Sequence, residues 1–262
     1  EDILAIVAAA PGATVATYSA LTKNDDRPNL WVVAGKGRVA SRIPSGNGGN
    51  GCDGPALDWA IAQRPSAASP IIWVDGLDLH MINFFESGFM EHHNDKRQTL
   101  TKKDGESVSR YGSGLAPMTN ESPFGLTSPI FNYPYARTRE ALHGLVRAGS
   151  PDACHGYKLR YVNPASGGAP IATMGTFMQI LPKGFVTSPY RSTDGTVFSV
   201  VEGTGESTIG DRTFRWKKRD HFVVPSWAKV VHKAASETVL FSFSDRPVQE
   251  RLDLWREDRG GK

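Results

Sequence analysis

The chain has 262 residues, of which 39% are hydrophobic and 22% charged, a composition that excludes a disordered tail and indicates a soluble globular protein. Lys and Arg together number 30 and Asp and Glu 27, so a net charge of +3 gives no case for nucleic acid or an anionic membrane as partner. No apolar stretch approaches the roughly 20 residues of a membrane helix. The 27 glycines and 17 prolines favour short strands joined by turns over long helices.

Residues 1–69 carry weak element signals. Residues 3–10 are apolar like a signal peptide core, but acidic residues precede them where a leader needs basic ones, so no leader is predicted. The two cysteines, Cys52 and Cys154, are too few for a disulfide framework. We therefore expect a cytoplasmic protein with reduced thiols.

The next stretch, up to residue 130, opens on a strand signal. Residues 71–74 are β-branched and aromatic and predict a buried strand, which the Asp75-Gly76 turn signal ends. Residues 91–109 are polar and predict an exposed loop. The adjacent His92 and His93 lie in that loop, and neighbours on a strand face opposite ways, so a shared metal ion is disfavoured.

The remainder of the chain has the pattern of a complete domain. A helix is predicted at residues 135–148, with an apolar face and Gly149 as its stop, and a terminal helix at residues 248–256. Between them, Gly and Pro separate short strand-like segments, which predict a closed sandwich or jelly-roll barrel. These segments are residues 158–162, 175–181, 197–201, 206–209, 212–216, 221–224, 230–233 and 239–243.

From about residue 70 onward the chain resembles gentisate 1,2-dioxygenases. The resemblance rests on a series of phrases in order: Trp73-Val74-Asp75-Gly76-Leu77-Asp78, Arg110-Tyr111-Gly112-Ser113, Lys158-Leu159-Arg160-Tyr161-Val162-Asn163-Pro164, Pro189-Tyr190-Arg191-Ser192-Thr193-Asp194-Gly195-Thr196-Val197, Val223-Val224-Pro225-Ser226-Trp227 and Phe243-Ser244-Asp245-Arg246-Pro247-Val248-Gln249-Glu250. It implies an all-β cupin fold with a few short helices. Residues 131–262 would form a complete C-terminal cupin barrel with its terminal helix, and residues 1–130 an incomplete or atypical N-terminal cupin region, of which 1–69 is unlike the family.

The resemblance also implies a chemistry. Family members hold Fe(II) in the N-terminal barrel through three histidines, two of them in a His-x-His pair, and bind gentisate and O₂ at that iron. The ring opens to maleylpyruvate in aromatic compound degradation. Neutral imidazoles suit a ferrous ion and leave coordination positions open. A homo-oligomer is expected, and the C-terminal barrel is usually free of metal.

The C-terminal barrel of this chain lacks the ligands of a cupin metal site. Counted from Gly184, the histidine pair falls on Tyr190-Arg191-Ser192, the carboxylate on Thr196 and the third ligand on Val230. His232, two residues beyond Val230, could share its face. We expect a buried or half-exposed structural histidine there, because one imidazole without partners makes no iron site.

The N-terminal region lacks them as well. None of the seven histidines precedes His80, so no metal ligand and no catalytic residue is identified, and Fe(II), although expected for the family, is not expected in this chain. Asp75 is the one candidate site residue. The resemblance places it at the edge of the iron pocket, orienting groups by hydrogen bonds. The alternative, which the sequence leaves open, is that Asp75 only forms the Asp-Gly turn.

Two functions remain open from the sequence. The first is Fe(II)-dependent cleavage of gentisate or a similar hydroxylated aromatic acid by O₂. The second is a catalytically inactive, truncated or frameshifted cupin that acts only as a structural or oligomerising domain. The preferred ring acid, among gentisate, salicylate and hydroxynaphthoate, is not specified by the sequence.

Overall fold

The computed structural model of the protein describes most of the second half of the chain and short pieces before it. The described residues are 76, 78–86, 106–112, 118, 128–130 and 133–260. They belong to two compact units: helix α2 (Leu79–Phe84) lies in one, and the described residues from Ser107 onward lie in the other.

Several predictions concern residues outside this part of the chain. They are those for residues 1–69, for the strand at 71–74, for Asp75, for Cys52 and for His92 and His93. The division into regions 1–130 and 131–262 also stays a prediction.

A short helix, α3 (Glu106–Tyr111), begins inside the predicted loop at residues 91–109, so that prediction is wrong at its C-terminal end. The segment contains neither Gly nor Pro, and Arg110 in its last turn complements the helix dipole. None of the described helices is long and apolar enough to cross a membrane.

Helix α4 (Tyr135–Ala148) coincides with the predicted helix, and its C-cap is Gly149. Only Leu142 of its apolar residues is buried, so the helix lies on the unit's surface and is not part of the core. Arg139 and Tyr135 hold it in place through Glu202: the guanidinium forms an ion pair at 2.9 Å, and the phenol donates a hydrogen bond at 2.7 Å.

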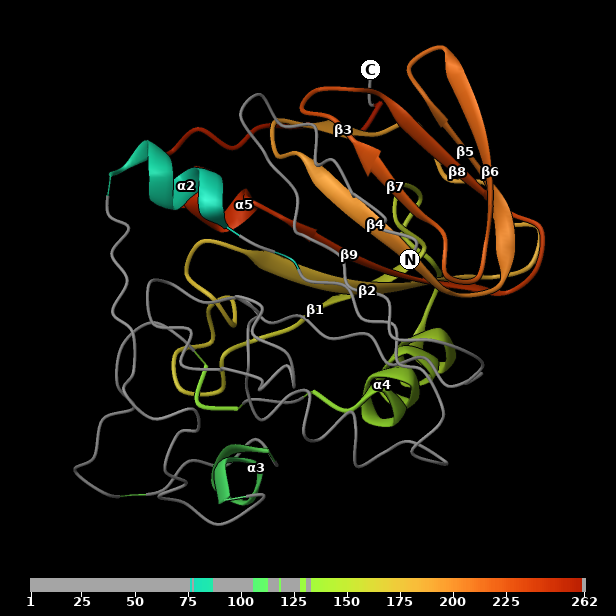
Figure 1. The fold of residues 1–262 in the computed structure, drawn as a ribbon. Helices are drawn as coiled ribbons and strands as arrows, with labels where there is room; N and C mark the ends of the chain where they lie inside the picture. The colour runs from blue at the N-terminus through green and yellow to red at the C-terminus, as the bar shows by residue number, and fades with distance from the viewer. Residues whose placement is uncertain are drawn as a thin grey trace, which may run out of the picture. The chain divides into compact units, whose positions relative to one another are not determined.

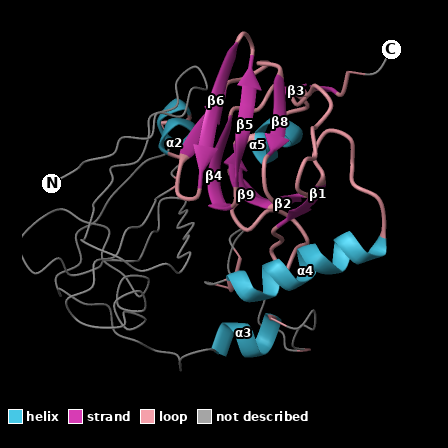
Figure 2. Ribbon diagram, turned by 90° about the vertical axis from the view of Figure 1, so that its right-hand side faces the viewer, coloured by secondary structure: helices cyan, strands magenta, loops and turns pink. Residues whose placement is uncertain are grey.

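The strands form two main antiparallel sheets and one short pair (Figures 1 and 2). The larger sheet has the order β1 (Tyr157–Arg160), β2 (Gly175–Leu181), β9 (Thr238–Ser244), β4 (Thr196–Glu202), β7 (His221–Val224). The smaller has the order β6 (Arg212–Lys217), β5 (Thr204–Ile209), β8 (Val230–Ala234). The pair joins β3 (Arg191–Ser192) to β10 (Glu257–Asp258). The all-β prediction is confirmed.

A core of apolar side chains lies between the two main sheets. β2, β4, β7 and β9 of the larger sheet and β6 and β8 of the smaller one all contribute to a single cluster, which shows that the sheets pack face to face. Its buried members are Leu181, Phe198, Val200, Trp216, Val224, Val230, Ala234 and Leu240.

The sequence misplaced the end of the chain. Helix α5 spans Arg246–Arg251, two residues before the predicted start at 248 and well short of the predicted end at 256. Pro247 sits in its first turn, where a missing N–H costs nothing. Asp253 has a positive φ of 56°, which ends the helical path and turns the chain toward β10.

Candidate functional site

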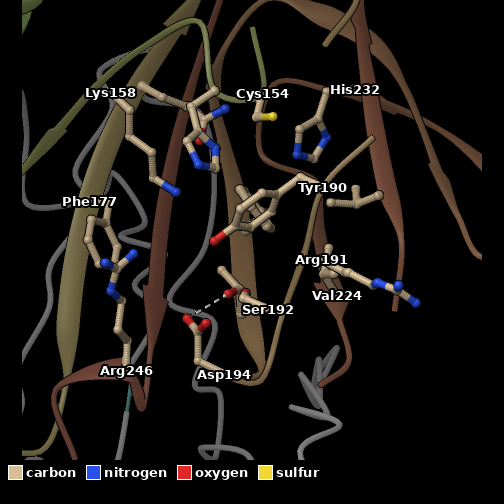
Figure 3. A pocket seen from close by; sticks show the side chains of 15 residues that line it. Cys154, Lys158, Phe177, Tyr190, Arg191, Ser192, Asp194, Val224, His232 and Arg246 are labelled. Carbon is tan, nitrogen blue, oxygen red and sulfur yellow. Dashed lines mark hydrogen bonds between the residues drawn. The ribbon is translucent and has the colours of Figure 1, made fainter. Parts of the chain in front are cut away.

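A polar cavity of about 30 Å³ lies within the strand-rich unit, with strands of both sheets in its wall (Figure 3). Strands β1, β2, β4, β7 and β8, the β3 segment and the start of α5 supply its walls. The lining residues are Cys154, His155, Lys158, Phe177, Gln179, Tyr190, Arg191, Ser192, Asp194, Thr196, Phe198, Val224, Val230, His232 and Arg246.

Lys158 supplies a positive charge to the cavity. It lies on β1, partly buried, with its ammonium 4.8 Å from the centre of the Phe177 ring. It makes no ion pair within 4 Å of a carboxylate in the described part of the chain. Burial lowers the pKa of Lys158 to about 8, although the charge of Asp194 acts in the opposite direction. In Figure 3 its side chain extends toward the hydroxyl of Tyr190.

Gln179 faces Lys158 across the β1–β2 register. The residue is 1% exposed, and neither its amide nitrogen nor its amide oxygen has a hydrogen-bond partner among the described residues. Buried polar groups are almost always hydrogen-bonded, so this carboxamide at the cavity wall is available to a water molecule or a ligand group inside the cavity.

Asp194 is the one carboxylate among the described residues of the wall, and its hydrogen bonds are supplied by the protein. Trp255 Nε1 donates to Oδ1 at 2.9 Å and Thr196 Oγ1 to Oδ2 at 3.4 Å, while Ser192 and Ser244 also donate (Figure 3). Burial alone would raise the pKa of Asp194, but these hydrogen bonds outweigh it and hold the pKa below its usual value.

Two histidines of the wall are uncharged. Burial lowers the pKa of both His155 and His232 to about 3, and the nearby charge of Lys158 adds to the effect. His155 packs edge-on against the Tyr190 ring, with ring centres 4.5 Å apart. His232 Nδ1 lies 2.7 Å from Ser207 Oγ.

The Ser207 contact assigns the tautomer of His232. Trp216 Nε1, which can only donate, gives a hydrogen bond to Ser207 Oγ at 2.8 Å. The fully buried Ser207 hydroxyl also has a hydrogen of its own to donate, and among the described residues His232 Nδ1 is the acceptor that it contacts. The neutral ring therefore carries its proton on Nε2, which is a donor. Figure 3 shows this ring turned into the cavity. The sequence expectation of a buried or half-exposed histidine is confirmed, with 3% exposure.

This barrel does not fit an iron ion. The cupin ligand positions hold Tyr190, Arg191, Ser192, Thr196 and Val230, none of which is an imidazole or a carboxylate. Over the described ranges, no group of three or more His, Cys, Asp and Glu side chains is placed to hold a metal.

Sequence reasoning found one part of the cavity wall and missed another. The counted cupin ligand positions Tyr190-Arg191-Ser192, Thr196 and Val230, together with His232, all line the cavity. Asp75, the one site residue it named, lies outside the described residues. Lys158 and Gln179 were noticed only as parts of predicted strands. The predicted strands at 158–162 and 175–181, which pair in the structure, contain a lysine and a glutamine. These two polar residues could have indicated the site, because interior strand positions are normally apolar.

Comparison with characterised proteins identifies relatives. A scan against models of protein families finds no match. Gentisate 1,2 dioxygenase 1 of Aquipseudomonas alcaligenes is 51% identical over 190 residues, which are 72% of this chain and 54% of the relative. The 5-aminosalicylate 1,2-dioxygenase of a Comamonas species is 31% identical over 205 residues, 78% of this chain and 54% of that protein. The chain thus spans about half the length of the curated relatives it matches.

Solved structures give the same picture. Salicylate 1,2-dioxygenase from Pseudaminobacter salicylatoxidans superposes with a TM-score of 0.68 and 30% identity, covering 74% of this chain and 57% of that chain. A variant of that enzyme, solved in complex with gentisate, superposes with a TM-score of 0.68 and 29% identity over 74% of this chain and 55% of that chain.

Proposed function

We propose, from the premise that this chain belongs to the gentisate 1,2-dioxygenase family, that it serves the O₂-dependent ring cleavage of gentisate or a related hydroxylated aromatic acid. The family resemblance predicted from the sequence and the cupin fold class are confirmed. The observation that carries the proposal is the 51% identity over 190 residues. With gentisate as substrate, the product would be maleylpyruvate.

The C-terminal barrel is assigned a supporting role in this proposal. In the family, a bound ferrous ion supplies the activation of O₂ beside the ring. The residues at the ligand positions of the described barrel do not fit that ion, so no step of the reaction is assigned to them. The barrel would contribute a packed core and outer sheet faces through which subunits can assemble. We propose that the protein is a homo-oligomer in the cytoplasm.

Anaerobic reconstitution tests the activity. The chain is purified without O₂, supplied with Fe(II), and given gentisate and then O₂. We expect consumption of gentisate and O₂ in equal amounts, with absorbance of the ring-opened product. Product without any bound iron, or stoichiometric iron without product, would contradict the proposal.

A second candidate function is a non-catalytic structural or oligomerising cupin. The absence of histidine before His80 favours it, because the family holds its iron through histidines of the N-terminal barrel. The same reconstitution separates the two: neither iron nor product, together with a stable oligomer by light scattering, would support the second candidate and overturn the first.

Asp75 has a proposed role in the first candidate function, ring cleavage. We propose that it orients groups at the edge of the iron pocket, so Asp75→Asn should lower kcat at least tenfold while the bound iron stays stoichiometric. The matched control is Asp211→Asn, at an exposed turn between β5 and β6, which should leave kcat unchanged. If both variants behave alike, Asp75 has only the turn role.

A further inference from the structure

We propose that the polar cavity of the C-terminal barrel is a binding site for a small carboxylate anion, held by Lys158, Gln179 and His232. This site is separate from the proposed ring cleavage and does not depend on it. The charge of the wall, its unpaired hydrogen-bonding groups and the size of the cavity support the site.

Among the described residues, the charges of the wall leave one cation without an ion pair at contact distance. Arg191 forms an ion pair with Asp258 at 2.8 Å, and Arg246 with Glu250 at 2.7 Å. Figure 3 shows the Arg191 guanidinium turned away from Asp194 and Tyr190. Lys158 is the remaining cation, and its ammonium lies against a ring face.

Asp194 does not serve as that counter-ion at contact distance. No salt bridge joins it to Lys158 in the described residues, and its oxygens already accept hydrogen bonds from Trp255, Thr196, Ser192 and Ser244. A carboxylate supplied with this many donors is stabilised without a lysine. The positive charge in the cavity therefore has room for an added anion.

The hydrogen-bonding groups fit a carboxylate. The Gln179 amide nitrogen is a buried donor without a partner, and His232 Nε2 carries a proton on a ring turned into the cavity. Together with the ammonium, they provide three donors, and a carboxylate has about four lone-pair positions to accept them. Charge-assisted bonds of this kind are about twice as strong as neutral ones.

The size restricts the ligand. The cavity volume is about 30 Å³, and one water molecule needs about 10–15 Å³ on the same scale. The cavity therefore holds a carboxylate group and little more. Phe177, Phe198 and Val224 line the same space and would pack against a methyl group. Formate and acetate fit these limits, and an aromatic acid such as benzoate does not.

Binding is measured on the full chain without iron. Acetate labelled with ¹³C is titrated with protein, and its line broadening is followed by NMR. We expect one saturable site per chain, competition by formate, and none by benzoate. Chloride should compete at least tenfold more weakly. Absence of saturable binding, or chloride and acetate competing equally, would overturn the carboxylate proposal.

Matched variants locate the site. Lys158→Met keeps the stem over Phe177 and removes the charge, and Gln179→Leu removes the amide; each should weaken acetate binding at least tenfold. Lys183→Met, at an exposed turn, should leave it unchanged. Because Gln179→Leu removes a buried unpaired group, its thermal midpoint without ligand should not fall. Undiminished binding in folded Lys158→Met would refute the site.

Discussion

Ser207 is fully buried and joins Trp216 on β6 to His232 on β8 through its single hydroxyl. Replacing Ser207 by Ala leaves the indole N–H and the imidazole nitrogen unpaired in the core. Each loss costs about 1–3 kcal/mol, so we expect the free energy of unfolding to fall by roughly 2–6 kcal/mol. Urea unfolding measures this change.

The control for this prediction is Ser236→Ala. Ser236 accepts a hydrogen bond from the Thr204 backbone N–H at 3.0 Å, but in an exposed setting where water can take its place. It should cost less than about 1 kcal/mol. Equal costs for the two variants would contradict a special role for the buried serine.

The buried neutral histidines predict acid sensitivity. The pKa of His155 and His232 falls to about 3 in the folded chain, whereas the unfolded chain binds their protons near pH 6.5. Between these values the unfolded state binds more protons, so stability is full above pH 6.5 and falls as pH decreases. Each histidine contributes at most about 1.4 kcal/mol per pH unit.

Urea midpoints at pH 7, 6 and 5 measure this dependence. His155→Gln should reduce the slope without abolishing it, because burial also lowers the pKa of His232 and His221, which stay linked to protons. A midpoint that stays constant from pH 7 to pH 5 would contradict the neutral state of these rings.

At the scale of elements, the end of the chain completes the wall of the cavity. β10 pairs with β3, the Thr193 N–H donates to the Arg256 carbonyl at 3.0 Å, and Trp255 donates to Asp194. Trp255→Phe keeps the ring but removes the donor. The pKa of Asp194 should rise and the stability at pH 7 should fall by about 1–3 kcal/mol.

Trp227→Phe is the control for this prediction. Trp227 is 43% exposed and stacks on Arg191 through its ring face, which phenylalanine preserves. A change of stability within about 0.5 kcal/mol is expected. If both tryptophan variants lose the same amount of stability, the loss in Trp255→Phe does not come from the hydrogen bond to Asp194.

The sequence predicted the strands that Gly and Pro separate and missed the two-residue ones for a physical reason. α4, β2 and the four-residue β7 were placed at their observed bounds, and the predictions for β4 and β9 fell one residue short at each end. β3 and β10 have two residues each, and their pairing joins Arg191 to Asp258, far along the chain. Nothing local in such pairs marks a strand. For the same reason the sequence did not bring Lys158, Gln179 and His232 to one cavity.

At the scale of the whole molecule, the unit from Ser107 onward has its own core and two complete sheets. We therefore expect limited proteolysis to leave a resistant fragment that starts between Ser107 and Tyr135 and retains all the strands. Mass spectrometry of the fragment identifies its ends. Early cleavage inside β2, β4 or β9 would contradict an independently stable barrel.

The order of strands in the larger sheet has a consequence for protein synthesis. β9 lies in the middle and pairs with both β2 and β4, yet it is made after β4, β5, β6, β7 and β8. On the ribosome, where chains grow at about 5–20 residues per second, β2 and β4 wait several seconds with unpaired edges before their shared neighbour is translated. Such edges invite pairing with other chains, so nascent copies of this protein are expected to depend on chaperone binding during that interval.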